Sequence, residues 1–75
     1  SPRYGYKLKD GEFTIDEKQA EIVRKIYEMY SKGRGYKLIA RWLNENKIPA
    51  PRGPRWTHNA VREIISNEIY KGILV

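Results

Sequence analysis

Residues 35–66 decide the fold of this chain and read GYKLIARWLNENKIPAPRGPRWTHNAVREIIS. Apolar residues recur at helical spacing at the two ends of this stretch, which predicts helices over about Tyr36–Glu45 and Thr57–Ser66. The segment between them contains prolines that exclude both a continuous helix and a central strand. Helix, turn, basic loop and helix in this order predict a helix-turn-helix-like unit, in which the earlier helix supports the last one.

The last predicted helix has an apolar and a polar face. Its inward stripe consists of Ala60, Val61, Ile64 and Ile65, and Thr57 is a suitable N-cap. The polar face holds residue types that read base edges, since Asn matches adenine, Arg matches guanine and His donates or accepts. The predicted base-contacting residues are Thr57, His58, Asn59, Arg62 and Ser66. An ordinary solvent-exposed helix face would have the same composition, so this pattern alone leaves both interpretations open.

The loop before this helix is basic and stiff. Two prolines in residues 51–55 present Arg52 and Arg55 at little entropic cost, which suits contact with phosphates or a groove. A solvated connector whose arginines contact nothing is the alternative. We expect Trp56 to plug the core at the end of the loop rather than stack on a base. The predicted contacts to the DNA backbone or groove are Arg3, Lys37, Arg41, Lys47, Arg52 and Arg55.

The helix over residues 36–45 is predicted to bury one stripe and expose the other side. We expect the buried stripe to be Leu38, Ile39, Trp42 and Leu43, with Lys37 and Arg41 on the other side. Asn46 is expected to adopt the left-handed conformation that ends the helix.

Residues 4–15 carry the pattern of a β-hairpin. Asp10-Gly11 lies between alternating apolar residues, and both turn positions favour positive φ. This turn pairs Tyr6 with Ile15 and Leu8 with Phe13, so the apolar side chains share one face. Because a lone hairpin is marginally stable, we expect this face to pack on helices or gain a third strand, for which residues 73–75 are the candidate.

A supporting helix is predicted over residues 17–31. Asp16 and Gln19 have the spacing of a capping box, and Gly33 stops the helix. The expected core-facing residues are Ala20, Val23, Ile26, Tyr27 and Tyr30. The chain is therefore predicted to be a single α+β, mainly α domain over residues 1–75, with a hairpin (4–15), a scaffold helix (17–31), a helix-turn-helix region (36–66) and a closing turn or strand (67–75).

Positive charge is concentrated in one segment. The chain has a net charge of +6, and residues 32–62 contain eight bases against the single acid Glu45, whereas residues 12–31 contain five acids and three bases. A segment of this kind is an electrostatic footprint for a polyanion, although a basic surface also aids solubility. The absence of cysteine and the lone histidine exclude a disulfide framework and a zinc site. With no long apolar run or signal pattern, we expect a soluble, cytosolic domain without a membrane segment.

The order of short motifs resembles the DNA-binding recombinase domain of the large serine recombinases, which include phage integrases and transposon resolvases. The matching pieces are Tyr4-Gly5-Tyr6, Ile22-Val23, Ile26-Tyr27, Gly35, Ile39-Ala40-Arg41-Trp42-Leu43-Asn44, Ile48-Pro49, Pro51-Arg52-Gly53, Trp56-Thr57, Val61, Ile64-Ile65 and Asn67-Glu68-Ile69-Tyr70-Lys71-Gly72. Together they cover nearly the whole chain. Two positions depart from the family pattern: Tyr36 replaces the usual Ser or Thr cap, and Glu68 stands where proline is common.

The resemblance implies that this chain is the middle domain of a larger bacterial or phage-encoded recombinase. A catalytic domain with the nucleophilic serine would precede it, and a zinc-ribbon domain would follow. The last helix would enter the major groove of an attachment half-site, and flanking segments would reach the backbone or minor groove. The parent would assemble on double-stranded DNA as a dimer and then a tetramer, whereas the isolated domain would be a monomer with no cofactor.

Other functions are open to the sequence alone. A generic helix-turn-helix or winged-helix regulator, with the hairpin as its wing, and a protein-docking module have the same composition. Catalysis by this fragment is disfavoured, because strand cleavage needs several cations around one phosphate beside the nucleophile. We expect Tyr70, the nucleophile that a tyrosine recombinase would need, to pack in the core while Asn67 closes the last helix.

Overall fold

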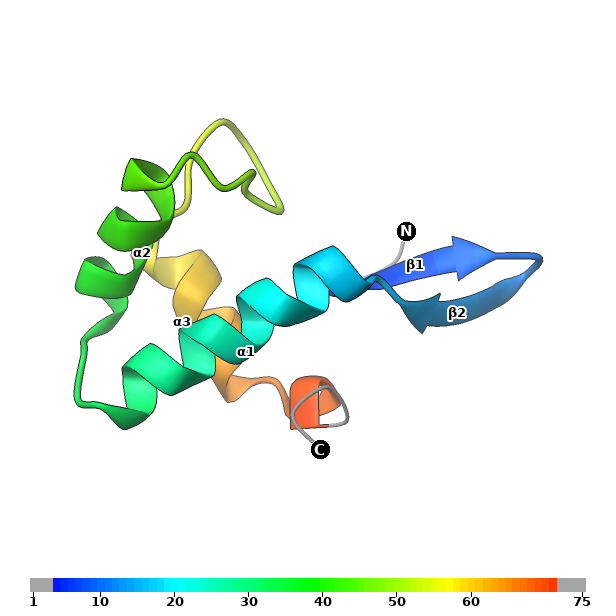
Figure 1. The fold of residues 1–75 in the computed structure, drawn as a ribbon, viewed down its shortest axis with the longest axis horizontal. Coiled ribbons are helices and arrows are strands. Elements are labelled where there is room, and N and C mark those ends of the chain that lie inside the picture. Colours follow the sequence, from blue (N-terminus) through cyan, green and yellow to red (C-terminus); the bar gives the residue numbers. More distant parts are fainter. Residues whose placement is uncertain (1–3, 72–75) are drawn as a thin grey trace.

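The computed structural model describes residues 4–71 and confirms the α+β, mainly α class. The order is β1 (Tyr6–Lys9), β2 (Glu12–Ile15), α1 (Glu17–Ser31), α2 (Tyr36–Glu45), α3 (His58–Ser66) and a short 3-10 helix, η1 (Glu68–Tyr70). All three α-helices have the bounds expected from the sequence to within a residue. Figure 1 shows the helices gathered together and the hairpin extending beyond the first turn of α1.

The three α-helices enclose a small apolar core. Its fully buried members are Ala20, Val23 and Ile26 of α1, Ile39 and Leu43 of α2, and Val61 of α3. Met29, Ala40, Trp56, Ile64 and Tyr70 complete it. Among the described residues no buried side-chain nitrogen or oxygen lacks a hydrogen-bond partner. The core therefore fixes the relative positions of α2 and α3 without an internal polar defect.

The beginning of α1 joins the hairpin to the helices. Asp16 Oδ1 accepts from the amides of Lys18 and Gln19 at 3.1 and 3.2 Å, as a capping residue should. The reciprocal half of the expected capping box is missing, because Gln19 Oε1 accepts from the amide of Gly5 at 2.8 Å. The Asp16 amide instead donates to the Gly5 carbonyl at 2.9 Å. Gln19 thus ties the root of the hairpin to α1.

Two helix-stripe predictions were wrong at their edges. Tyr30 is 43 % exposed and stacks on Tyr36 with 5.6 Å between ring centroids, while Met29 occupies the buried position. Leu38 is 50 % exposed and Ala40 is buried in its place, because α2 turns its Ile39 and Leu43 side toward the core. Whether a residue at the edge of an apolar stripe is buried depends on how the helices cross. Helical spacing in the sequence does not specify that crossing.

The end of α2 differs from the prediction by one residue. Asn46 caps the helix at φ −89°, and Lys47 takes the left-handed conformation at φ 56°. Asn46 instead donates through its side chain to the carbonyl of Trp42 at 2.8 Å. The side-chain amide of Asn46 therefore bonds to the last turn of α2, and Lys47 adopts the left-handed conformation.

The connector between α2 and α3 is clamped where it begins and ends. Asn44 accepts from the Trp56 amide at 2.8 Å and donates to the Trp56 carbonyl at 3.0 Å. The Trp56 indole donates to the carbonyl of Ile48 at 3.0 Å, and its buried ring confirms the expected core plug. These three bonds hold the start of α3 against the end of α2.

The hairpin has the predicted register but not the predicted packing. Tyr6 pairs with Ile15 and Leu8 with Phe13, around a turn in which Asp10 and Gly11 have φ of 52° and 79°. The expectation that the apolar face would be covered was wrong within the described residues, since Leu8 is 56 % and Phe13 66 % exposed. Among residues 4–71 the hairpin is anchored at its root, where the Tyr6 hydroxyl donates to the Ile69 carbonyl at 2.8 Å. The third-strand candidate, residues 73–75, lies outside the described residues.

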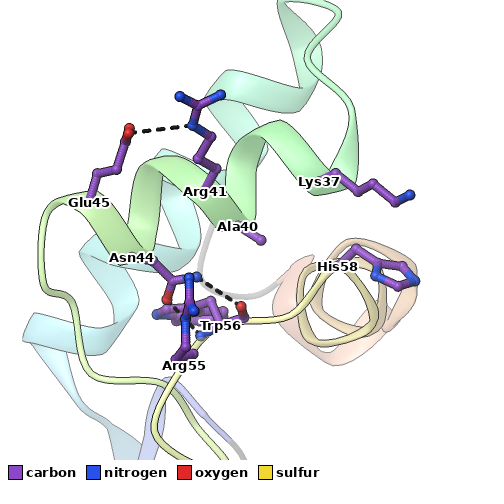
Figure 2. A pocket seen from close by; sticks show the side chains of 8 residues that line it. All are labelled: Lys37, Ala40, Arg41, Asn44, Glu45, Arg55, Trp56 and His58. Carbon is purple, nitrogen blue, oxygen red and sulfur yellow. Dashed lines mark hydrogen bonds and ion pairs between the residues drawn. The ribbon is translucent and has the colours of Figure 1, made fainter.

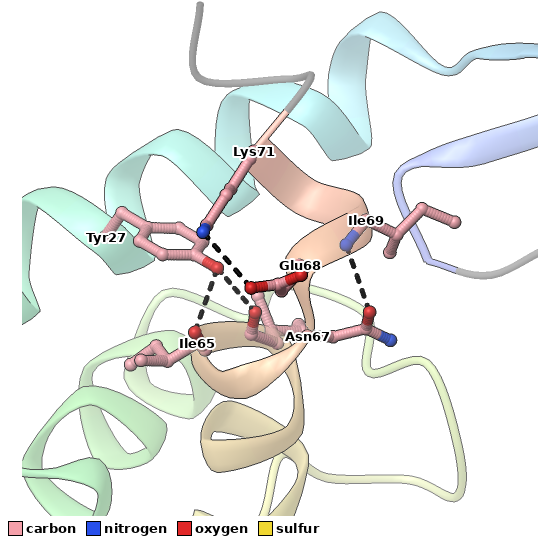
Figure 3. A network of polar contacts seen from close by, with 7 residues as sticks. Tyr27, Ile65, Asn67, Glu68, Ile69 and Lys71 are labelled. Atoms are coloured by element: carbon pink, nitrogen blue, oxygen red, sulfur yellow. Dashed lines mark hydrogen bonds and ion pairs between the residues drawn. The ribbon is translucent and has the colours of Figure 1, made fainter.

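A polar network fixes the far end of α3 (Figure 3). The Tyr27 hydroxyl of α1 contacts the carbonyls of Ile64 and Ile65 at 2.7 and 3.1 Å. Asn67 ends α3, as expected, and its side chain accepts from the Ile69 amide at 3.1 Å. Because Trp56 holds one end of α3 and Tyr27 the other, the orientation of its outward face is set by the core.

Candidate nucleic-acid interface

The outward face of α3 carries all the side chains predicted to contact bases. Thr57, His58, Asn59, Arg62 and Ser66 are each exposed. Val61 and Ile64 point inward and are buried. This division places three hydrogen-bonding types, imidazole, amide and guanidinium, on one accessible helix surface. These are side-chain types that can hydrogen-bond to base edges.

A hollow between α2 and the beginning of α3 gathers predicted backbone-contacting residues (Figure 2). Lys37 and Arg41 come from α2, Arg55 from the connector and His58 from α3. In Figure 2 Lys37 and His58 extend to the same side of the view, whereas Arg41 and Glu45 project from the side of α2 opposite Asn44, Trp56 and Arg55. Three bases that are separated in sequence therefore line one hollow together with His58, a residue of the outward face of α3.

The beginning of α3 adds amide groups to this surface. The Thr57 hydroxyl accepts from the Ala60 amide at 3.2 Å, which confirms the predicted N-cap. The N-terminus of a helix carries free amides and favours anions, and His58, the first residue of α3, lines the hollow together with Arg55.

The remaining predicted cations are spread along the connector. Lys47 lines a second shallow hollow with Asn44, Pro54 and Arg55, so the two hollows share Asn44 and Arg55. Arg52 is exposed but lines neither hollow. Arg3 lies outside the described residues. Lys47 and Arg55 therefore extend the set of bases along the connector, and the contact of Arg52 remains a prediction.

A tyrosine pair lies beside Arg62. Tyr36 begins α2 and stacks on Tyr30 at an interplanar angle of 8°. Hydrogen bonding to Tyr30 raises the pKa of Tyr36, while the positive charge of Arg62 acts in the opposite direction. The N-cap of α2 is Gly35, which has no side chain to bond the first-turn amides, and Tyr36 is the first residue of the helix. The charge of Arg62 on the polar face of α3 therefore acts on the first residue of α2.

Sequence reasoning missed two residues of the hollow. Asn44 was expected only as part of a motif, yet it links the two hollows and holds Trp56. Glu45 is the single acid in the hollow and pairs with Arg41, with 3.4 Å between Arg41 Nε and Glu45 Oε2. The i, i+4 spacing of Arg41 and Glu45 is visible in the sequence and was the signal for this pair.

Other kinds of site find no support in the part of the chain that the structure describes. Tyr70 is 4 % exposed, as expected, which keeps its hydroxyl away from any DNA phosphate. Across residues 4–71 there is no group of three histidine, cysteine or acidic side chains placed to hold a metal ion. Nor does any helix in the same range have the length and apolar character needed to cross a membrane.

A family model described as Recombinase matches residues 17–75, which is most of the chain. The chain therefore belongs to the Recombinase family. Its membership indicates a role in site-specific recombination as part of a recombinase. The matched range begins with α1 and leaves the hairpin outside. No curated protein and no solved structure gives a significant match.

Proposed function

We propose that this chain binds double-stranded DNA at a recombination attachment half-site, as the middle domain of a site-specific serine recombinase. The supporting observation is that the hollow with Lys37, Arg41 and Arg55 adjoins the exposed polar face of α3. The nucleophilic serine lies in another domain of a bacterial or phage-encoded parent that acts in the cytoplasm. That parent forms a dimer and then a tetramer on DNA.

Binding combines two kinds of contact. His58, Asn59 and Arg62 read base edges while α3 lies in the major groove. Lys37, Arg41 and Arg55 neutralise phosphates beside the groove, and the N-terminus of α3 receives one of them. The clamped connector carries Arg52 outward to the backbone or to the neighbouring minor groove. Phosphate contacts set the position of the domain, and base contacts select the site.

The electrostatic part is tested by the salt dependence of binding to duplex DNA. Lys37→Ala removes one phosphate contact, so it should weaken binding to all sequences alike and reduce the slope of log K against log salt by about 0.9. Lys18→Ala, an exposed lysine in the first turn of α1, removes the same charge elsewhere and is the matched control. Equal effects of the two variants would contradict a localised interface.

The base-reading part is tested by selection of preferred sites from random duplexes. Arg62→Ala should cost about 1 to 3 kcal/mol on the preferred site and relax the preference at one position. Arg55→Ala should weaken preferred and random duplexes by the same factor. If the Arg55 variant changed the selected sequence and the Arg62 variant did not, α3 would be rotated in the groove relative to this proposal.

Two further measurements separate this function from the alternatives. Light scattering should show a monomer in isolation, whereas a free helix-turn-helix regulator would dimerise through its own surface. Incubation with supercoiled DNA carrying the attachment site should leave no covalent protein–DNA adduct. A seryl or tyrosyl adduct would show that this chain is itself catalytic.

A further inference from the structure

Glu45 has the wrong charge for its surroundings. It is the single acid among the eight bases of residues 32–62. It lines the same hollow as Lys37, Arg41 and Arg55, which the proposed function assigns to phosphates. A carboxylate on such a surface opposes the approach of a polyanion, because like charges at short range repel.

The ion pair of Glu45 with Arg41 does little for the fold. The two side chains are 61 % and 74 % exposed, and an exposed pair at i, i+4 contributes only about 0.3 to 0.5 kcal/mol. The helix α2 is held instead by the buried Ile39 and Leu43 and by the bonds of Asn44 to Trp56. Stability therefore does not explain why an acid occupies this position.

We propose that Glu45 is an affinity-limiting residue, which occupies Arg41 as an internal counter-charge and lowers the affinity of this surface for any DNA backbone. This inference rests on the proposed DNA-binding function. A phosphate that approaches Arg41 must displace the Glu45 carboxylate from it, so Arg41 contributes less to binding than Lys37 or Arg55. The competition acts on the backbone contacts, which supply nearly all non-specific affinity.

A weaker affinity for the DNA backbone has a clear physical use. A domain with a net charge of +6 binds every stretch of DNA to some degree, and non-specific sites outnumber attachment sites by many orders of magnitude. A carboxylate in the backbone-contacting hollow weakens those encounters, while the base contacts of α3 are left intact. The chain thus retains a basic surface without being held on random sequence.

The test compares Glu45→Gln with Glu28→Gln on a random duplex at several salt concentrations. Glu28 is also exposed and bonded to lysines, at 3.5 Å from Lys25 and 3.3 Å from Lys32, but it lies on α1. Both changes add one unit to the net charge. Glu45→Gln should tighten binding about threefold to tenfold at low salt and steepen the salt slope by about 0.9, because Arg41 becomes available. Glu28→Gln should change affinity by less than about twofold.

A double-variant cycle shows whether Arg41 carries the effect. In an Arg41→Gln background, Glu45→Gln removes only the direct repulsion of the carboxylate, so the salt slope should no longer steepen by about 0.9. Equal effects of the two single variants, a full Glu45 effect without Arg41, or weaker binding to the preferred site would each overturn the inference. The last result would mean that Glu45 accepts from a cytosine amino group. If the wild-type chain bound no duplex at all, the proposed function itself would fail.

Discussion

The hairpin and the three-helix unit both follow a regular apolar pattern, but only the helices bury it. Ile39 and Leu43 of α2 are fully buried, whereas Leu8 and Phe13 face solvent although they pair as the turn dictates. The helical stripes meet one another around Trp56, while the hairpin extends past the start of α1 (Figure 1). A pattern therefore determines which side chains share a face, and the placement of the element determines whether that face is covered.

The largest difference between the two regions should appear on core truncation. Ile39→Ala removes a fully buried side chain that links α2 to the core, and we expect it to lower the free energy of unfolding by about 2 to 5 kcal/mol. Urea unfolding followed by circular dichroism measures this. A loss below about 1 kcal/mol would mean that α2 is not held by this core.

Loss of the clamp on the connector should have the next largest effect. Asn44→Ala removes both bonds to Trp56 and leaves backbone groups without their partner, so we expect a loss of about 2 kcal/mol. Asn46→Ala is the matched control, since it removes one exposed bond and should cost less than about 1 kcal/mol. Similar losses in the two variants would show that the clamp has no special role.

Alkaline pH should test the joint between the two regions. Desolvation by burial, with Asp16 and Tyr70 acting in the same direction, raises the pKa of Tyr4 from 10.0 to about 12. Because the folded-state pKa is the higher one, this stabilisation is complete below pH 10 and is lost as pH rises through about 12. For a half-buried ring we expect a loss of about 1 kcal/mol.

Tyr4→Phe provides the control for this titration. The variant keeps the edge contact with Trp56, whose ring centroid lies 5.2 Å away, but has no hydroxyl to ionise. Its free energy of unfolding should therefore fall less steeply above pH 10 than that of the wild type. Identical slopes would place the Tyr4 hydroxyl in water.

The smallest effect is expected at the tip of the hairpin. Phe13→Thr replaces an exposed aromatic side chain by a residue that also favours strands, so stability should change by no more than about 0.5 kcal/mol. The same urea experiment measures it. A loss comparable to that of Ile39→Ala would show that the hairpin face is covered in solution and would remove the contrast between the regions.

The sequence correctly predicted the features that depend on neighbouring residues, such as turns and helix starts. Asp10-Gly11 set the hairpin register, Asp16 and Thr57 marked the starts of α1 and α3, and Trp56 closed the core. The errors concern positions whose environment is decided elsewhere in the chain. Leu38 and Tyr30 lie at the borders of their stripes, so the crossing of the helices exposes them. Lys47 takes the left-handed conformation in place of Asn46, whose side chain donates to the Trp42 carbonyl.

The candidate interface was predictable to a similar extent. Helical spacing was enough to place His58, Asn59 and Arg62 on one exposed face. The meeting of Lys37, Arg41 and Arg55 in one hollow depends on how α2 packs against α3, which no local pattern contains. The roles of these side chains in binding remain predictions for the experiments above.

The clamp between Asn44 and Trp56 bears on which parts of this domain can change in sequence and length. Both hydrogen bonds of Asn44 to Trp56 and the indole bond to Ile48 involve no residue of the segment 49–55. The position of α3 against α2 therefore does not depend on that segment. We expect residues inserted, deleted or exchanged there to leave α3 where it is. Under the proposed function, new arginines or a longer connector would then change the contacts to the DNA backbone while the orientation of α3 stays the same.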